Sequence, residues 1–124
     1  MSLRITRIDY GDVTVLELDG RINLGSGAVV FRKTVRDLLK EGRLKLVVVQ
    51  EGVSFVDSAG NGELVTAYTT ARNVGGDLVF AGREGAITNV FQITKLFTVF
   101  QIFDTVRDAL SYFAKGKTRG KPPA

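Results

Sequence analysis

The chain has 124 residues, of which 44% are hydrophobic and 24% charged, and this length and balance fit one globular domain with a core of its own. It contains neither cysteine nor histidine. Disulfides, thiolate chemistry and histidine-based catalysis are therefore excluded, and any metal site would consist of oxygen ligands alone. The 13 acidic residues show no calcium-loop spacing, so we expect neither a metal ion nor a cofactor.

The net charge of +4 arises at the C-terminal end of the chain. Residues 115–124 contain four basic side chains and no acidic one, whereas residues 1–114 contain 13 of each sign. Glycine, proline and lysine dominate this last stretch, which is typical of a disordered end. We predict a folded domain over residues 1–114 and a basic disordered tail over residues 115–124, with no specific nucleic-acid partner.

No apolar run is long enough to cross a membrane, and the N-terminal stretch MSLRITRIDYG lacks the apolar core of a signal peptide. The absence of cysteine also fits a reducing compartment. The sequence therefore predicts a soluble, cytoplasmic protein that does not insert into a membrane.

The first part of the chain predicts two strands, a helix and a third strand. LRITRI and VTVLELDG are rich in β-branched and aliphatic residues, and DYGD between them fits a hairpin turn. Apolar residues then recur at helical spacing within residues 25–42, with Ser26 placed to cap the helix and Gly42 to end it. LKLVVV is a short aliphatic run that ends at Val49 and is typical of a buried central strand.

The remaining chain predicts three helices and two strands. Apolar residues from Leu64 onward have helical spacing, and the glycine pair at 75–76 ends that helix. DLVFA predicts a strand, EGAITNVFQI a short helix and TVFQIF an edge strand. A last helix follows, and we expect Asp104 or Thr105 to cap it. The alternating order predicts an α/β fold, with a mixed, mostly parallel sheet of about five strands and about four helices.

One edge of this sheet is expected to gather polar residues. If the strands that end near Leu18, Val49 and Phe80 are parallel, their carboxyl ends meet at one edge, where α/β proteins place ligand sites. The residues expected at that edge are Asn23, Asp57, Ser58 and Arg83.

The stretch SFVDSAGNGEL, residues 54–64, lies at this edge between a strand and a helix. Ser58 is not expected to be a hydrolase nucleophile, because the chain has no histidine base and no G-x-S-x-G elbow. Two compatible roles are left open, an N-cap formed by Asp57 or Ser58, and acceptance of a phosphoryl group by Ser58. A phosphoryl group there would gain from the helix dipole and lie beside Asp57, which makes a charge switch.

A third hypothesis is a small-molecule or nucleotide site at the same edge. Gly60 and Gly62 lie near a helix start, where free N–H groups favour anions, and Arg83 could contribute a positive charge. No P-loop lysine follows the glycines, so the pattern disfavours a nucleotide hydrolase.

The motif residues also carry a family resemblance. GVSFVDSAGNGEL resembles the D-S-x-G signature of STAS domains, especially of bacterial anti-sigma factor antagonists. VTVLELDGRIN, ARNVGGDLVFAG and ITKLFTVFQIFDTVRDAL resemble the flanking elements of that family, so the resemblance covers roughly residues 3–114.

The resemblance implies a protein-binding switch that is not itself an enzyme. Such antagonists bind a serine-kinase anti-sigma factor and thereby free a sigma factor. The kinase phosphorylates the serine after the motif aspartate, here Ser58, and a phosphatase restores the binding form. The partner-binding positions implied for this chain are Asn23, Asp57, Ser58, Ala59, Gly60 and Asn61.

Three positions depart from the family pattern. Members often have Asp at the position of Asn23, Asp or Asn at that of Val49, and a larger apolar residue at that of Asn61. The lost charge motivates an alternative, in which the protein is an unphosphorylated STAS scaffold or the regulatory subunit of a membrane transporter.

The segment NVFQITKLFTVFQIF is rich in phenylalanine, and we expect most of its aromatic rings in the core. The four phenylalanines are Phe91, Phe97, Phe100 and Phe103. Val99 and Gln101 alternate as in an edge strand, whose open edge could support a homodimer or a partner strand.

Overall fold

The structure is a computed structural model that describes residues 3–94 and 99–115. Strands and helices alternate along this part of the chain. The elements are β1 Leu3–Tyr10, β2 Val13–Ile22, α1 Ser26–Lys40, β3 Lys45–Val56, α2 Ser58–Asn73, β4 Asp77–Ala81, α3 Ala86–Thr94, β5 Ile102–Phe103 and α4 Val106–Ala114.

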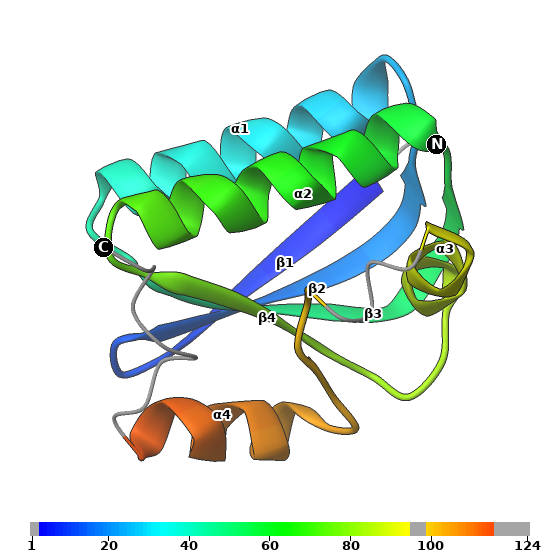
Figure 1. Ribbon diagram of the computed structural model, residues 1–124. Coiled ribbons are helices and arrows are strands. Elements are labelled where there is room, and N and C mark those ends of the chain that lie inside the picture. The colour runs from blue at the N-terminus through cyan, green and yellow to red at the C-terminus, as the bar shows by residue number, and fades with distance from the viewer. Residues whose placement is uncertain (1–2, 95–98, 116–124) are drawn as a thin grey trace.

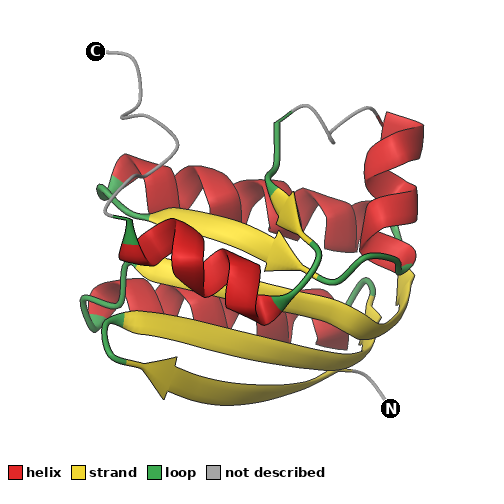
Figure 2. Cartoon of the chain, turned by 90° about the horizontal axis from the view of Figure 1, so that it is seen from below, coloured by secondary structure: helices red, strands yellow, loops and turns green. Residues whose placement is uncertain are grey.

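The described strands form one mixed sheet in the order β1-β2-β3-β4-β5. β1 is antiparallel to β2, and the other neighbouring pairs are parallel. α1 and α2 lie side by side along one face of the sheet, and α4 crosses the other face (Figure 1, Figure 2). The predicted α/β fold is confirmed, including its element order.

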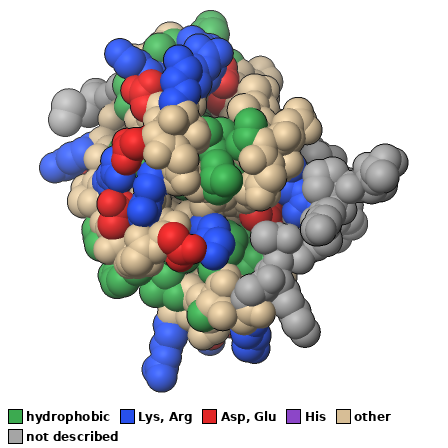
Figure 3. Space-filling view, turned by 90° about the vertical axis from the view of Figure 1, so that its left-hand side faces the viewer, with side chains coloured by type: hydrophobic (Ala, Val, Ile, Leu, Met, Phe, Trp, Pro, Cys, Tyr) green, Lys and Arg blue, Asp and Glu red, His purple; other side chains and the backbone are tan. Residues whose placement is uncertain are grey.

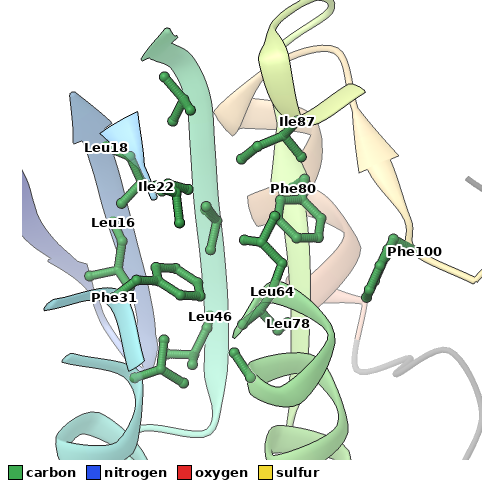
Figure 4. Packing of buried hydrophobic residues seen from close by; sticks show 14 of the residues in the cluster. Leu16, Leu18, Ile22, Phe31, Leu46, Leu64, Leu78, Phe80, Ile87 and Phe100 are labelled. Carbon is green, nitrogen blue, oxygen red and sulfur yellow. The ribbon is translucent and has the colours of Figure 1, made fainter. Parts of the chain in front are cut away.

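The core has a cluster on each face of the sheet. Under α1 and α2, Phe31 and Leu64 point from the helices toward the strand residues Leu16, Leu46 and Leu78 (Figure 4). Under α4, a smaller cluster joins valines of β2, β3 and β4 to the buried helix residues Ala109 and Phe113. The first four residues of β2 are all buried, as in a strand that is covered on both faces.

Two strands differ in length from the sequence prediction. β3 continues seven residues beyond Val49, and that outer part pairs with β2 but not with β4, whose last residue Ala81 lies opposite Val49. β5 has only two residues, and residues 99–101 do not join it. The β2–β3 ribbon therefore projects beyond its neighbours, and its register shifts twice as it does so.

The phenylalanines are core residues where the structure describes them. Phe91 and Phe100 are buried and stacked, with ring centroids 4.6 Å apart, and Phe103 is half-buried. Phe97 lies outside the described residues, as does the predicted tail beyond residue 115.

Helix ends follow the predictions with one exception. Gly42 ends α1 in a left-handed conformation, with its N–H donating to the Leu39 carbonyl, and Thr105 caps α4 by accepting the Asp108 N–H at 3.1 Å. Ser26 does not cap α1. The helix already begins at Ser26, and the residue before it, Gly25, has no side chain to cap with.

The end of the molecule where the parallel strands β2, β3 and β4 begin is a mixed-charge surface. Ion pairs join the hairpin to neighbouring elements there, as between Arg7 and Glu41 at 2.8 Å and between Lys45 and Asp12 at 2.7 Å. Side chains of both signs are interspersed on this face (Figure 3). Within residues 3–94 and 99–115, no helix is both long enough and apolar enough to span a bilayer.

Candidate functional site

The site lies where β2 and β3 end and two parallel helices begin. A short turn, Asn23–Gly25, leads from β2 into α1, and the single residue Asp57 leads from β3 into α2. Both helices start at the same end of the molecule (Figure 1). Residues far apart in the sequence therefore meet at this end.

Asp57 joins the two connections through its carboxylate. Oδ1 accepts the Gly60 N–H at 2.8 Å, which caps α2, and Oδ2 accepts the Leu24 N–H at 2.8 Å. The backbone N–H of Asp57 donates to the Ile22 carbonyl oxygen at 3.3 Å. The aspartate is thus both the N-cap of α2 and the anchor of the β2–α1 turn.

These donors also stabilise the charged form of the carboxylate. The Leu24 N–H, followed by the Gly60 N–H, lowers the pKa of Asp57 below its usual value, since hydrogen bonds to the charged form favour it. Asp57 therefore stays ionised at neutral pH and presents a fixed negative charge beside Ser58.

Ser58 is the first residue of α2 and is exposed. The structure decides between the two proposed caps, because the side chain of Asp57, and not that of Ser58, accepts the Gly60 N–H. The serine hydroxyl is therefore not needed as the cap and stands at the positive end of the helix dipole.

Glycines bring both helices against the end of β2. Gly60 is buried, and a Cβ on it would overlap the carbonyl oxygen of Ile22. A Cβ on Gly27, in the first turn of α1, would likewise overlap the carbonyl oxygen of Arg21. The β2 terminus is therefore enclosed by backbone on two sides, which leaves little room for the site to rearrange.

Two asparagines complete the rim. The side-chain oxygens of Asn23 and Asn61 are buried and have no hydrogen-bond partner among the described residues, although both residues are partly exposed as a whole. Ala59 is also partly exposed. The structure thus brings together five of the expected positions around Ser58, those of Asn23, Asp57, Ala59, Gly60 and Asn61.

Arg83 does not join this group, so its expected convergence with Ser58 is wrong. It follows β4, which ends opposite Val49, and β3 runs on for seven residues, roughly 20 Å, before it reaches the site. The Arg83 side chain is exposed and its Nε lies 3.6 Å from Asp104 Oδ2.

Val49 likewise lies away from the site. It is half-buried in the middle of β3 and packs against the cluster under α4. At this position the chain has an apolar side chain that contributes to the core, so the departure from the family pattern does not alter the surface around Ser58.

The sequence did not point to Leu24, Arg21 or Phe55, which flank the site. The side chain of Leu24 is highly exposed in the turn, with 77% of its surface accessible. The Arg21 guanidinium lies 4.6 Å from the centroid of the Phe55 ring, which is also exposed. The available signal for Leu24 was an apolar residue in the otherwise small and polar stretch NLGSG.

The fold and the site together define a small α/β domain with an exposed serine at a helix start, preceded by an ionised capping aspartate. The chain belongs to the STAS domain family, whose model matches residues 4–109.

Relatives support this assignment in sequence and in fold. A Thermotoga neapolitana protein named for anti-sigma factor antagonists is 30% identical over 100 residues, which cover 80% of this chain and 88% of that protein. A crystal structure from Thermotoga maritima, of a protein named in the same way, has a TM-score of 0.78 at 25% identity and covers 86% of this chain and 92% of that one. The phosphorylated form of SpoIIAA from Bacillus has the same fold, with a TM-score of 0.70 at 18% identity over 89% of this chain and 99% of that one.

Proposed function

We propose that the protein is an anti-sigma factor antagonist whose binding is gated by phosphorylation of Ser58. In its unphosphorylated form it binds a serine-kinase anti-sigma factor in the cytoplasm, and the sigma factor held by that kinase is freed. The observation that carries this proposal is the exposed Ser58 at the start of α2, next to an Asp57 whose charge is fixed by backbone donors. The relatives named for this activity support it.

The chemistry of the switch is a phosphoryl transfer from ATP to the Ser58 hydroxyl. The serine oxygen forms a bond to the γ-phosphorus, ADP leaves, and the hydroxyl proton passes to a base of the kinase. A phosphatase hydrolyses the phosphoserine and returns the hydroxyl. The protein supplies the acceptor and its position, and it needs no base of its own.

Charge explains how the phosphoryl group would end binding. The phosphoryl group adds a charge of about −1.5 to −2 at neutral pH, directly beside the ionised Asp57. The α2 N-terminus stabilises this charge within the protein, so the backbone need not move. A partner surface shaped for a neutral hydroxyl would instead face a concentrated negative charge.

The expected interface positions divide into two groups. Gly60 is buried and the Asp57 carboxylate is engaged by backbone donors, so these residues hold the site in shape. Ser58 is exposed, and three partly exposed neighbours surround it, so these four offer the contact surface. The partly exposed residues are Asn23, Ala59 and Asn61. A homodimer would use an edge strand of the described sheet, either β1 or the two-residue β5.

A second candidate function has the same fold but involves no kinase. Asn23 lies at the contact surface without the carboxylate common in the family, which favours an unphosphorylated scaffold or a regulatory subunit of a membrane transporter. Copurification of the native chain with a permease, rather than with a kinase, would support this alternative.

Phosphate mapping separates the two candidates. The chain is incubated with the cognate serine kinase and ATP, and the modified residue is located by mass spectrometry. Ser26 is a matched internal control, because it is also exposed and also opens a helix but has no aspartate before it. The proposal predicts phosphate at Ser58, none at Ser26, and no incorporation into Ser58→Ala. Persistent absence of phosphate at Ser58 would reject it.

A further inference from the structure

The turn between β2 and α1 exposes an apolar side chain directly beside the phosphorylation site. Leu24 is 77% exposed, whereas the residue before the turn, Ile22, is fully buried. Single exposed apolar residues are common on protein surfaces and carry no function by themselves. Leu24 is of interest for its position, because its N–H binds the carboxylate of Asp57, the residue before Ser58.

The peptide group that joins Asn23 to Leu24 is held by two hydrogen bonds. Its N–H donates to Asp57 Oδ2 at 2.8 Å, and the carbonyl oxygen of Asn23 accepts the Ala28 N–H at 2.9 Å. Gly25 follows with a φ of 93°, a conformation that favours glycine and turns the chain into α1. The side chain therefore projects from a turn that is already ordered before any partner arrives.

An ordered apolar side chain is suited to serve as an interface anchor. Burying it in a partner removes apolar surface from water, and little conformational freedom is lost because the backbone is already held. Interfaces concentrate binding energy in a few well-packed residues, surrounded by weaker contacts. The polar residues around Ser58 would form such a surrounding rim.

We infer that Leu24 is the apolar anchor by which the protein docks on its serine kinase, and that Asp57 is a positioning residue that holds Leu24 in place. The partner is a kinase with an apolar socket for one side chain beside its phosphoryl-transfer site. This inference rests on the proposed function. It assigns to Asp57 an effect on binding that operates through the turn and not through contact with the kinase.

A first experiment measures the affinity of Leu24→Ala for the kinase that phosphorylates Ser58. We expect the dissociation constant to rise by about 10-fold or more, as for other anchor residues. Val74→Ala is the matched control, because Val74 is also exposed, at 51%, and lies at the far end of α2, roughly 24 Å from Ser58. It should change the affinity less than about 2-fold. An unchanged affinity for Leu24→Ala overturns the anchor role.

A double-mutant cycle tests the positioning role. Asp57→Asn retains one carbonyl oxygen for Gly60 but weakens acceptance of the Leu24 N–H. If Asp57 acts through Leu24, the loss caused by Leu24→Ala should shrink to less than about 3-fold in the Asp57→Asn background. Equal losses in both backgrounds overturn the positioning role.

Amide hydrogen exchange gives a readout that needs no partner. Exchange of the Leu24 amide should be slow in the native chain and at least about 10-fold faster in Asp57→Asn. An unchanged rate contradicts the positioning role even if the cycle fails through misfolding. If the native chain itself fails to bind the kinase, the proposed function and the inference are both rejected. If the native chain binds and Leu24→Ala binds with the same affinity, only the inference is rejected.

Discussion

The carboxylate of Asp57 lies 2.8 Å from the backbone nitrogen of Leu24, a residue 33 positions earlier in the chain. This hydrogen bond links the start of α2 to the turn before α1, while the second carboxylate oxygen caps α2. The motif aspartate therefore has a structural task that precedes any contact with a partner. Several consequences can be measured on the protein alone.

The first consequence concerns the stability of the protein in acid. Because hydrogen bonds lower the pKa of Asp57 in the folded state below its ordinary value of 3.8, its stabilising contribution is complete above that value and is lost as the pH falls below it. Thermal melting of the native chain and Asp57→Asn from about pH 7 to about pH 3 should show a stability difference that is constant at high pH and shrinks in acid. A stability difference that grows in acid would contradict the lowered pKa of Asp57. The contributions of the other acidic residues cancel, because both chains contain them.

Gly60 and Gly62 make a matched pair two residues apart in α2. A Cβ on Gly60 would overlap the Ile22 carbonyl oxygen, whereas a Cβ on Gly62 would meet open space. Gly60→Ala should lower the free energy of unfolding by roughly 1–3 kcal/mol. Gly62→Ala should raise it by up to about 1 kcal/mol, since alanine favours the helix. Urea denaturation measures both, and equal effects would show that the close approach at Gly60 is not real.

Gln50 anchors the β4–α3 turn from within the core. Its amide nitrogen donates to the Gly82 carbonyl oxygen at 2.8 Å, and its oxygen accepts the Thr88 N–H at 3.0 Å. Gln50→Leu leaves both groups unpaired and should cost about 1–3 kcal/mol in the free energy of unfolding, with faster amide exchange in α3. Asn73→Leu makes a similar change on the surface and should stay within about 0.5 kcal/mol. Equal stability of the two variants would exclude this role.

Charge at Ser58 can be imitated without a kinase. Ser58→Asp places a carboxylate beside Asp57 and should weaken kinase binding by at least about 10-fold. Ser58→Ala removes the hydroxyl without adding charge and should bind nearly as well as the native chain. Calorimetry distinguishes the outcomes, and equal weakening by both substitutions would show that the hydroxyl, and not the added charge, controls binding.

The order of elements was predictable because the local patterns agree with the final sheet. Strand LKLVVV and the glycine pair at 75–76 mark their elements without help from distant contacts. The outer part of β3 was missed because Gln50, Glu51 and Gly52 interrupt the apolar run. That part is a strand only because β2 pairs with it, which is a tertiary effect.

The residues that make up the site were predictable from the sequence, but the structural role of each residue was less so. Parallel strands place Asn23 and Ser58 at the same end of the sheet, as expected, but the unequal strand lengths separate Arg83 from them. The capping role of Asp57 was one of two alternatives at the sequence level. Its bond to Leu24 spans 33 residues, and no local pattern reveals such a contact.

In the proposed function, phosphorylation of Ser58 switches off binding to the serine kinase. The most direct measurement is the dissociation constant of the purified kinase for the native chain and for the same chain stoichiometrically phosphorylated at Ser58, in one buffer and without ATP. We expect the kinase to bind the unmodified chain and to lose about 100-fold or more in affinity when Ser58 is phosphorylated. Equal affinity of the two forms would contradict it.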